Sequence, residues 1–338
     1  MGKKLWNVIK YVLSISLGVV LVWLVVRNIE WGSFLEGLKT TRWGYMLGFL
    51  AASVLAVVFR SLRWNQLLNP LDGGRTTFMD CWDANNIGNL GSLVIPGSSE
   101  PIRAGLVTTK KLPFQTVFGT MIMERAWDFL FIFITIVISL ILKLETFGGF
   151  MADNIVKPIS SSGVFWWILS AVVVLAVAFI WACYRFRTKV RFFERMANLI
   201  DGVLHGFKSF GKMKNKFPYI IYTTMIWVMY MLMCFFCLQA IPELSGLDMA
   251  DALFLSALGN VASVVPVPGG IGAYHYLIML CLSSLYGFSN ETGLLFATLN
   301  HEGHAVIILL LGIISYVTRM LRMKKRNAQS VRSRSSVG

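Results

Sequence analysis

Several ionisable side chains lie inside stretches that are otherwise apolar. Glu124, Arg125 and Asp128 occupy one short segment, and the residues that follow it, Phe129 to Leu142, are almost entirely apolar. An unpaired charge at the centre of a bilayer costs at least about 2.5 kcal/mol, so such residues either bind a ligand or pair with one another. Glu124 and Asp128 are four residues apart and share one helix face, which predicts a positive partner for at least one of them.

A second group of polar residues follows two Pro-Gly breaks. Glu100 and Arg103 follow Pro96-Gly97, and His275 stands at the corresponding place after Pro268-Gly269-Gly270. A helix N-terminus after such a break attracts anions, so a phosphate head group would suit these amides together with arginines. Carboxylates would pair with the arginines or carry coupling protons. The candidate substrate-binding residues are Arg103, Glu100, Arg125, Glu124, Asp128, Asn89, Asn260, His275 and Glu302.

An alternative interpretation assigns these side chains to structural pairs that hold helices together, at about 1 kcal/mol each. It applies to Glu124 with Arg125, to the histidines beside Glu302, and to the asparagines. Arg60, Arg63 and Trp64 end a predicted span, where we expect them to anchor the chain at the membrane interface. Recruitment of substrate is the alternative role for these three residues.

Two motifs resemble metal or redox sites but fail on spacing or context. His301-Glu302-Gly303-His304 places its histidines three residues apart, whereas the zinc-protease motif needs them four apart, and no third ligand is obvious beyond His275. Cys234 and Cys237 lie in an apolar helix and are interpreted as small apolar residues one turn apart. No metal, cofactor or catalytic residue is therefore expected.

The elements that must position these residues are membrane helices. Of 338 residues, 56% are hydrophobic and 14% charged, with mean hydropathy +0.65, whereas soluble domains carry about 25% charged residues. The apolar runs show no period-two alternation, which favours a helical bundle over a barrel. The fold class is therefore all-α and polytopic. About six full spans are predicted at 8–26, 43–60, 114–142, 164–184, 217–241 and 291–318, with two further segments, 80–106 and 252–286, broken by Pro and Gly.

Lysine and arginine bias orients the predicted spans. If each broken segment is a re-entrant hairpin, 25 of the 31 basic residues fall on the cytoplasmic side, including a linker at 185–216 and a tail expected to be disordered at 321–338. Both termini are then cytoplasmic, around a single membrane domain at 1–320. The net charge of +14 is explained by an anionic leaflet rather than by nucleic acid.

An internal repeat relates the two broken segments. Asp80 aligns with Asp251, and Ile87 to Val94 aligns with Leu258 to Val265. One inserted residue then aligns the two Pro-Gly breaks, and Glu124 aligns with Glu302 farther on. The halves, about 43–142 and 217–318, have opposite predicted orientations, and inverted repeats with broken helices are typical of alternating-access transporters.

Four motifs in this order carry a family resemblance. They are R-x-x-R-W at Arg60 to Trp64, N-L-G-S-L-V-I-P-G-x-x-E-x-x-R-A at Asn89 to Ala104, E-R-x-x-D at Glu124 to Asp128, and P-x-P-G-G-I-G at Pro266 to Gly272. Over about residues 5–320 the chain resembles the flippase-like membrane domain of the lysylphosphatidylglycerol synthase (multiple peptide resistance) family. His275 stands where that family usually has an acid, and Ser99 where it often has glycine. The soluble synthase domain is not expected, so synthase activity is not expected either.

The resemblance and the predicted architecture imply a lipid flippase of the bacterial inner membrane, not an enzyme. Its partner would be a phospholipid or polyprenyl-type lipid with an anionic, phosphate-bearing head group, moved passively or with a coupling proton or ion. Two alternatives stay open. One is a membrane-embedded transferase or phosphatase acting on lipid-linked substrates. The other is an accessory subunit of a cell-envelope complex, whose hairpin region would be closed by side chains.

Overall fold

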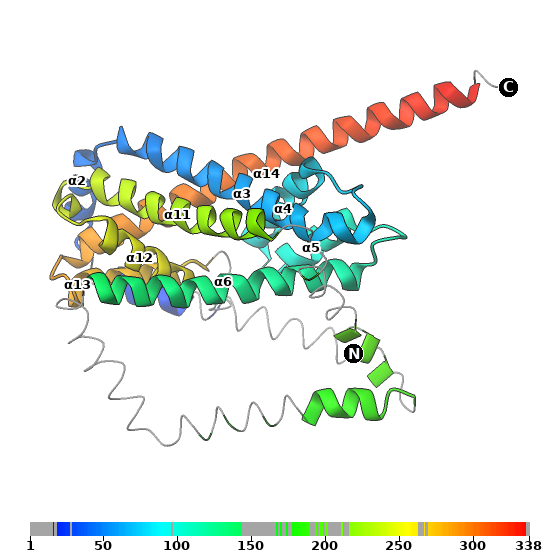
Figure 1. Cartoon of the computed structure of the whole chain (residues 1–338). Coiled ribbons are helices and arrows are strands. Elements are labelled where there is room, and N and C mark those ends of the chain that lie inside the picture. Colours follow the sequence, from blue (N-terminus) through cyan, green and yellow to red (C-terminus); the bar gives the residue numbers. More distant parts are fainter. Residues whose placement is uncertain are drawn as a thin grey trace.

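The computed structural model describes residues 16, 19–27, 29–95, 97–143, 216–262, 267 and 270–335, with scattered residues between 167 and 211. Every regular element in these ranges is a helix (Figure 1). The elements are α2 (Trp31–Thr40), α3 (Tyr45–Asp72), α4 (Phe78–Val94), α5 (Ser99–Val107), α6 (Phe114–Leu142), α11 (Phe217–Ala240), η2 (Pro242–Leu244), α12 (Met249–Ala262), α13 (Ala273–Ser284) and α14 (Asn290–Ser335). The chain is thus all-α in the part described.

Three helices are long and apolar enough to cross a membrane: α3, α11 and residues 290–324 of α14. α3 packs along α11, while α14 contacts α2, α13 and α4 in turn (Figure 1). Large apolar side chains such as Phe133 on α6 and Leu310 on α14 are exposed, as expected where lipid is the solvent. The chain is therefore a multi-pass membrane protein. The predicted spans 8–26 and 164–184 lie mostly outside the described residues.

Both predicted breaks separate two helices. α4 and α5 are joined across Ile95–Ser98, where Gly97 has φ +72°, and α12 and α13 are joined across a segment in which Gly270 has φ +78°. Both values lie in the left-handed region that glycine adopts without steric cost. The two helices of each pair pack against one another. The other predicted break residues, Pro96, Pro268 and Gly269, lie outside the described residues, and insertion of the pairs as re-entrant hairpins stays a prediction.

The first helix of each pair begins with the same reciprocal cap. Thr77 Oγ1 accepts from the Asp80 amide at 3.2 Å, and Asp80 Oδ2 accepts from the Thr77 amide at 3.0 Å. Asp248 Oδ1 accepts from the Asp251 amide at 3.1 Å, and Asp251 Oδ2 accepts from the Asp248 amide at 2.9 Å. Each arrangement satisfies two backbone donors at a helix start. The caps fall at positions that the sequence alignment of Asp80 with Asp251 makes equivalent.

A glycine brings the second helix of each pair close to the first. A Cβ added at Gly88 would lie 2.5 Å from Cγ of Arg103, and one added at Gly259 would lie 2.5 Å from Cε2 of Tyr274. Gly88 and Gly259 are also aligned in the predicted repeat. The two helix–break–helix units therefore share a cap and a close contact, while their inverted orientation in the membrane stays a prediction.

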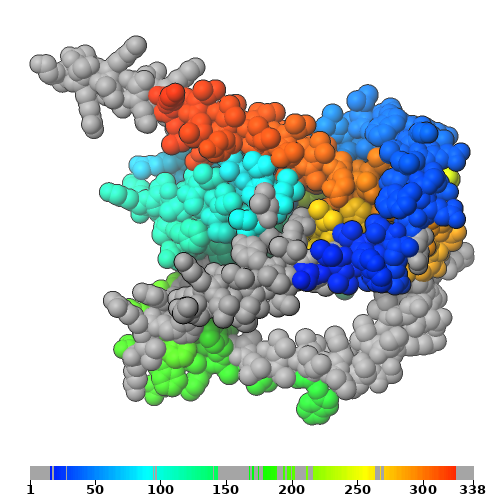
Figure 2. Space-filling model, turned by 180° about the vertical axis from the view of Figure 1, so that it is seen from behind, coloured from blue at the N-terminus to red at the C-terminus, as the bar shows by residue number. Residues whose placement is uncertain are grey.

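The C-terminal tail, 321–338, was expected to be disordered, but the structure describes it as helical up to Ser335. α14 continues to Ser335, and its C-terminal end projects beyond the body of the molecule (Figure 1). The described side chains of α14 before this end lie against α4 and α5 (Figure 2). The segment 321–335 contains neither Pro nor Gly and is rich in Arg, Lys and other good helix formers, so nothing in it ends the helix.

Candidate functional site: a polar cavity between the two helix pairs

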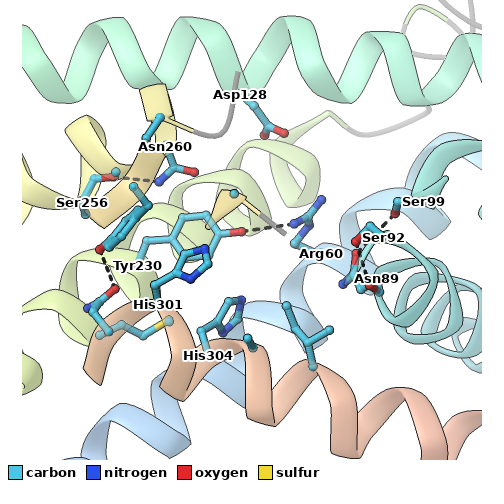
Figure 3. A pocket seen from close by; sticks show the side chains of 18 of the residues that line it. Arg60, Asn89, Ser92, Ser99, Asp128, Tyr230, Ser256, Asn260, His301 and His304 are labelled. Carbon is cyan, nitrogen blue, oxygen red and sulfur yellow. Dashed lines mark hydrogen bonds between the residues drawn. The ribbon is translucent and has the colours of Figure 1, made fainter. Parts of the chain in front are cut away.

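A cavity of about 720 Å³ lies between the two helix–break–helix units, α3, α6, α11 and α14 (Figure 3). One part of its wall is apolar, with Phe129, Ile132, Trp227 and Ile308. The polar part of the lining comprises Arg60, Asn89, Ser92, Ser99, Glu100, Arg125, Asp128, Tyr230, Ser256, Asn260, Asn300, His301 and His304. The cavity can therefore accept a charged or polar group beside an apolar one.

A buried ion-pair network lies behind this wall. Arg103 Nη2 is 2.8 Å from Glu124 Oε2, and Arg63 approaches Glu124 at 3.4 Å and Asp128 at 2.7 Å. The Arg103 guanidinium also lies 4.3 Å from the Trp64 ring centroid, a cation–π contact. The network joins α3, α5 and α6, and it confirms the predicted positive partner for Glu124 and Asp128.

Two predictions about this network need correction. Arg63 and Trp64 are fully buried, so they are not interfacial anchors. Trp64 Nε1 donates to Thr120 Oγ1 at 3.0 Å, which satisfies its only donor within the protein. The long α3 helix continues well past residue 60, and this carries both side chains into the core between α4, α5 and α6.

A second ion pair lies on the cavity wall itself. Arg125 Nη2 is 2.7 Å from Glu100 Oε1, and Arg125 also approaches Asp128 at 3.7 Å. The Arg125 side chain is 47% exposed and that of Glu100 is 25% exposed, so this pair can be reached from the cavity. It connects α6 to the helix that follows the first break.

Arg60 differs from the other two arginines of α3 and α5. It lines the cavity, its Nη1 donates to the Tyr230 hydroxyl over a long 3.4 Å, and no described carboxylate lies within 4.0 Å of it (Figure 3). The Arg125 guanidinium on the same wall is paired. Arg60 is therefore the guanidinium that the described residues leave available to an anion. From the sequence, Arg60 was expected to have only a minor role in the site. Its spacing of three and four residues from Arg63 and Trp64 nevertheless places all three side chains near one face of a helix.

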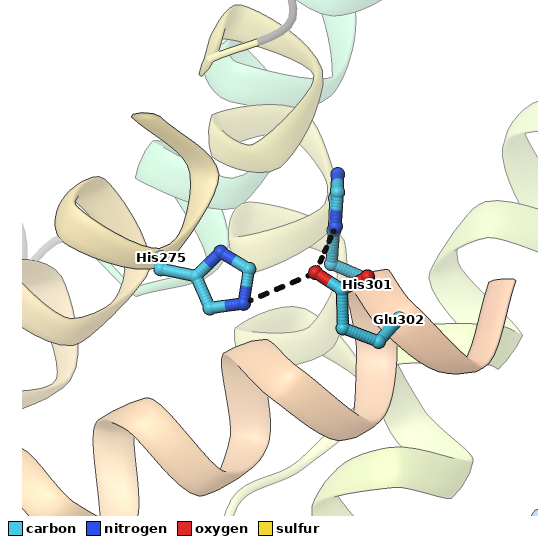
Figure 4. A group of neighbouring side chains, drawn as sticks. All are labelled: His275, His301 and Glu302. Carbon is cyan, nitrogen blue, oxygen red and sulfur yellow. Dashed lines mark hydrogen bonds and ion pairs between the residues drawn. The ribbon is translucent and has the colours of Figure 1, made fainter. Parts of the chain in front are cut away.

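The second helix pair carries a comparable polar cluster beside α14. Glu302 Oε1 lies 3.0 Å from His301 Nδ1 and 3.5 Å from His275 Nε2 (Figure 4). His304 takes no part, because its Nδ1 is 2.6 Å from the Ser53 hydroxyl. In the repeat alignment, His275 with Glu302 occupies the place of Arg103 with Glu124.

The structure divides the predicted site residues into two groups. Glu100, Arg125, Asp128, Asn89 and Asn260, with the break glycines Gly97 and Gly270, line the cavity. Arg103, Glu124, His275 and Glu302 do not belong to the lining; the first two are buried in the network behind it.

Two further ion-pair clusters, which the sequence did not single out, lie at opposite ends of the molecule. At one end Arg322 of α14 bonds to Asp83 of α4. At the other, Lys143 Nζ lies 2.9 Å from Asp248 Oδ2 and 3.1 Å from Asp251 Oδ2. The hydrogen bond to Asp248 raises the pKa of the Lys143 ammonium. These pairs fasten α14 to α4 and α6 to α12.

The helices and the cavity define a polytopic α-helical membrane protein with a cavity of mixed polar and apolar lining between two broken helix pairs. The sequence profile of the lysylphosphatidylglycerol synthase TM region matches residues 8–312, and the chain belongs to this family. The resemblance expected from the four motifs is thereby confirmed. Compared with curated proteins and with solved structures, the chain shows no significant match.

Proposed function

We propose that the protein is a lipid flippase that moves a lipid with an anionic, phosphate-bearing head group across the bacterial inner membrane. The observation that carries the proposal is Arg60, which lies on the wall of a cavity inside the helix bundle and has no carboxylate within 4.0 Å in the part of the chain that the structure describes. Membership of a family of membrane domains named for a lipid synthase is consistent with a lipid-related role.

The size and lining of the cavity suit a head group rather than a whole lipid. Its volume of about 720 Å³ lies within the usual range for small-molecule sites, about 300–1,000 Å³. The head group would occupy the polar part near Arg60, while Phe129 and Ile132 of α6 would face the start of the acyl chains. The rest of each chain would stay in the bilayer.

The charge distribution favours an anion. Among the described residues, the neutral hydroxyl of Tyr230 is the hydrogen-bond partner of Arg60, whereas the Arg125 guanidinium is paired with Glu100. A phosphate accepts paired N–H bonds from a guanidinium and would compensate the charge of Arg60. The exposed Arg125–Glu100 pair would offer a second arginine whenever Glu100 is protonated or displaced.

The presence of a cavity also favours the transporter hypothesis over the accessory-subunit alternative. That alternative expects Glu124 and Arg125 to be satisfied internally, and they are, but it also expects side chains to close the region between the hairpins. An open cavity that displays an arginine with no carboxylate within 4.0 Å among the described residues favours passage or binding of a ligand. We further propose that both termini are cytoplasmic and that the helix pairs enter from opposite faces, which would allow alternating access.

Reconstitution in liposomes tests this function. Fluorescent anionic and zwitterionic lipids are followed by dithionite quenching for the wild type, Arg60→Ala, Arg60→Lys and the exposed control Arg75→Ala. We expect the wild type to move an anionic lipid and Arg60→Ala to slow it by roughly 10- to 100-fold, as for loss of a charged hydrogen bond of about 1.5–3 kcal/mol. The control should match the wild type. Wild-type rates equal to those of empty liposomes for every lipid, or an unaffected Arg60→Ala, would reject the proposal.

A further inference from the structure

We propose that His275, His301 and Glu302 form a binding site for one divalent transition-metal ion of the zinc type. His275 lies in the first turn of α13, directly after the second break, and the other two residues are adjacent on α14. One ligand atom from each of the three side chains lies within 4.8 Å of the others. Figure 4 shows both imidazole rings directed toward the same carboxylate.

The distances suit a metal ion at the centre of the group. Zinc binds imidazole nitrogen and carboxylate oxygen at about 2.0–2.2 Å, so ligand atoms around a tetrahedral ion lie about 3.4 Å apart. Glu302 Oε1 is 3.0 Å from His301 Nδ1 and 3.5 Å from His275 Nε2. Small rotations of the side chains would seat the ion without moving either helix.

The donor set selects the class of ion. Two imidazoles and one carboxylate are the ligands of three-residue zinc sites, which leave a further position for water. Calcium and magnesium prefer oxygen ligands throughout, so they fit this group poorly. The expectation of no metal site rested on the spacing of His301 and His304 and on the lack of an obvious third ligand beyond His275. The ligand that completes the set comes instead from α13, on the other side of a turn.

The surroundings hold the ligands in place. The His301 ring lies 4.9 Å from the Tyr274 ring, and the Tyr274 hydroxyl donates to Asn300 Oδ1 at 2.9 Å. A Cβ on Gly270 would lie 3.2 Å from His301 Nε2, so the backbone of the break packs against the ring. The His275 side chain is only 10% exposed, whereas that of Glu302 is 40% exposed and leaves a path for entry.

The repeat supplies an independent argument. In the first half, the permanent positive charge of Arg103 compensates Glu124 at 2.8 Å. In the second half the aligned partner of Glu302 is His275, and neutral imidazole is the form that binds metals. A bound dication would supply on this side the positive charge that Arg103 supplies on the other.

Metal binding to the purified protein tests the site without reference to transport. The detergent-solubilised chain is stripped with a chelator, titrated with Co²⁺, read by its visible absorption, and then competed with Zn²⁺. We expect about one Co²⁺ per chain in a tetrahedral or five-coordinate environment. His275→Ala and Glu302→Gln should weaken binding by more than about 100-fold, beyond what loss of an outer-shell partner causes. His304→Ala, one turn away and bonded to Ser53, should bind as the wild type does.

Two controls make every outcome decisive. Thermal unfolding and size-exclusion chromatography establish that each variant is folded, and Glu302→Gln nearly preserves shape. A Cys234→Ser/Cys237→Ser variant removes the buried thiol pair that could also take Co²⁺. Absence of bound metal in the wild type, or binding that survives both His275→Ala and Glu302→Gln, overturns the site. Binding lost only in the cysteine variant overturns it as well.

Discussion

Arg103 and Glu124 form a buried ion pair, with Nη2 2.8 Å from Oε2, that joins the helix after the first break to α6. Arg103 is 2% and Glu124 3% exposed. Glu124 also lies 3.4 Å from Arg63, which pairs in addition with Asp128 at 2.7 Å, so two carboxylates compensate two buried guanidinium groups. The pair therefore fixes the wall on which Arg60 and Arg125 are displayed.

Removal of one partner of this pair should destabilise the fold. We expect Glu124→Gln and Arg103→Met each to lower the free energy of unfolding by about 3–5 kcal/mol, because each leaves a buried charge uncompensated. The readout is thermal unfolding in detergent. Arg103→Met combined with Glu124→Gln should cost less than the sum of the single changes. Strictly additive losses would show that the two side chains do not act as a pair.

The glycines that bring each second helix close should not tolerate a methyl group. Gly88→Ala and Gly259→Ala place Cβ 2.5 Å from Arg103 and Tyr274 respectively, so we expect losses of about 1–3 kcal/mol from overpacking. Gly105→Ala in α5 is the matched control, because nothing lies within 4 Å of its added Cβ. It should be neutral or slightly stabilising, since alanine favours helix. Equal melting temperatures for all three variants would contradict the close packing.

The link between Lys143 and Asp248 should respond to alkaline pH. The hydrogen bond to Asp248 raises the pKa of Lys143 above its unfolded value. The link therefore contributes fully below about pH 10.4, the pKa of a free lysine. It is lost as the pH rises through the higher folded-state pKa.

Thermal unfolding of the wild type and of Lys143→Met checks this prediction between about pH 7 and pH 11. The variant should be less stable by about 0.5–1 kcal/mol at neutral pH, as for a partly exposed ion pair, and the difference should shrink at the alkaline end. A difference that stays constant, or that grows with pH, would show that the ammonium charge is not what stabilises the link.

Sequence reasoning located the break regions because their signals are local. Each of these signals is contained in a short stretch of sequence: the Pro-Gly pairs, the residues around Asp80 and Asp251 that align, and the lengths of the apolar runs. The structure accordingly begins α4 and α12 at aligned positions and ends α6 at the predicted residue. The sequence also predicted that Glu124 and Asp128 need a positively charged partner. The cost of a lone charge in lipid does not depend on which helix supplies that partner.

The partners themselves could not be predicted in this way. Arg60 and Arg63 are three residues apart on α3, yet Arg63 is fully buried between two carboxylates while Arg60 faces the cavity. That difference arises from how α3 packs against α5, α6 and α11. The sequence likewise named His275 as a further histidine, but it could not show that α13 places this side chain 3.5 Å from Glu302.

The sequence by itself determined that the chain is a helical membrane protein with two broken segments and buried charges of both signs. Hydropathy, glycine conformations and helix caps depend on short stretches of the chain, so the sequence alone carries the information for them. Only the tertiary structure decided that Arg103 neutralises Glu124, that Arg60 lies on the cavity wall beside the Tyr230 hydroxyl, and that two histidines share Glu302. Ion pairing depends on distances of a few ångströms between residues far apart in the chain, and packing alone sets those distances.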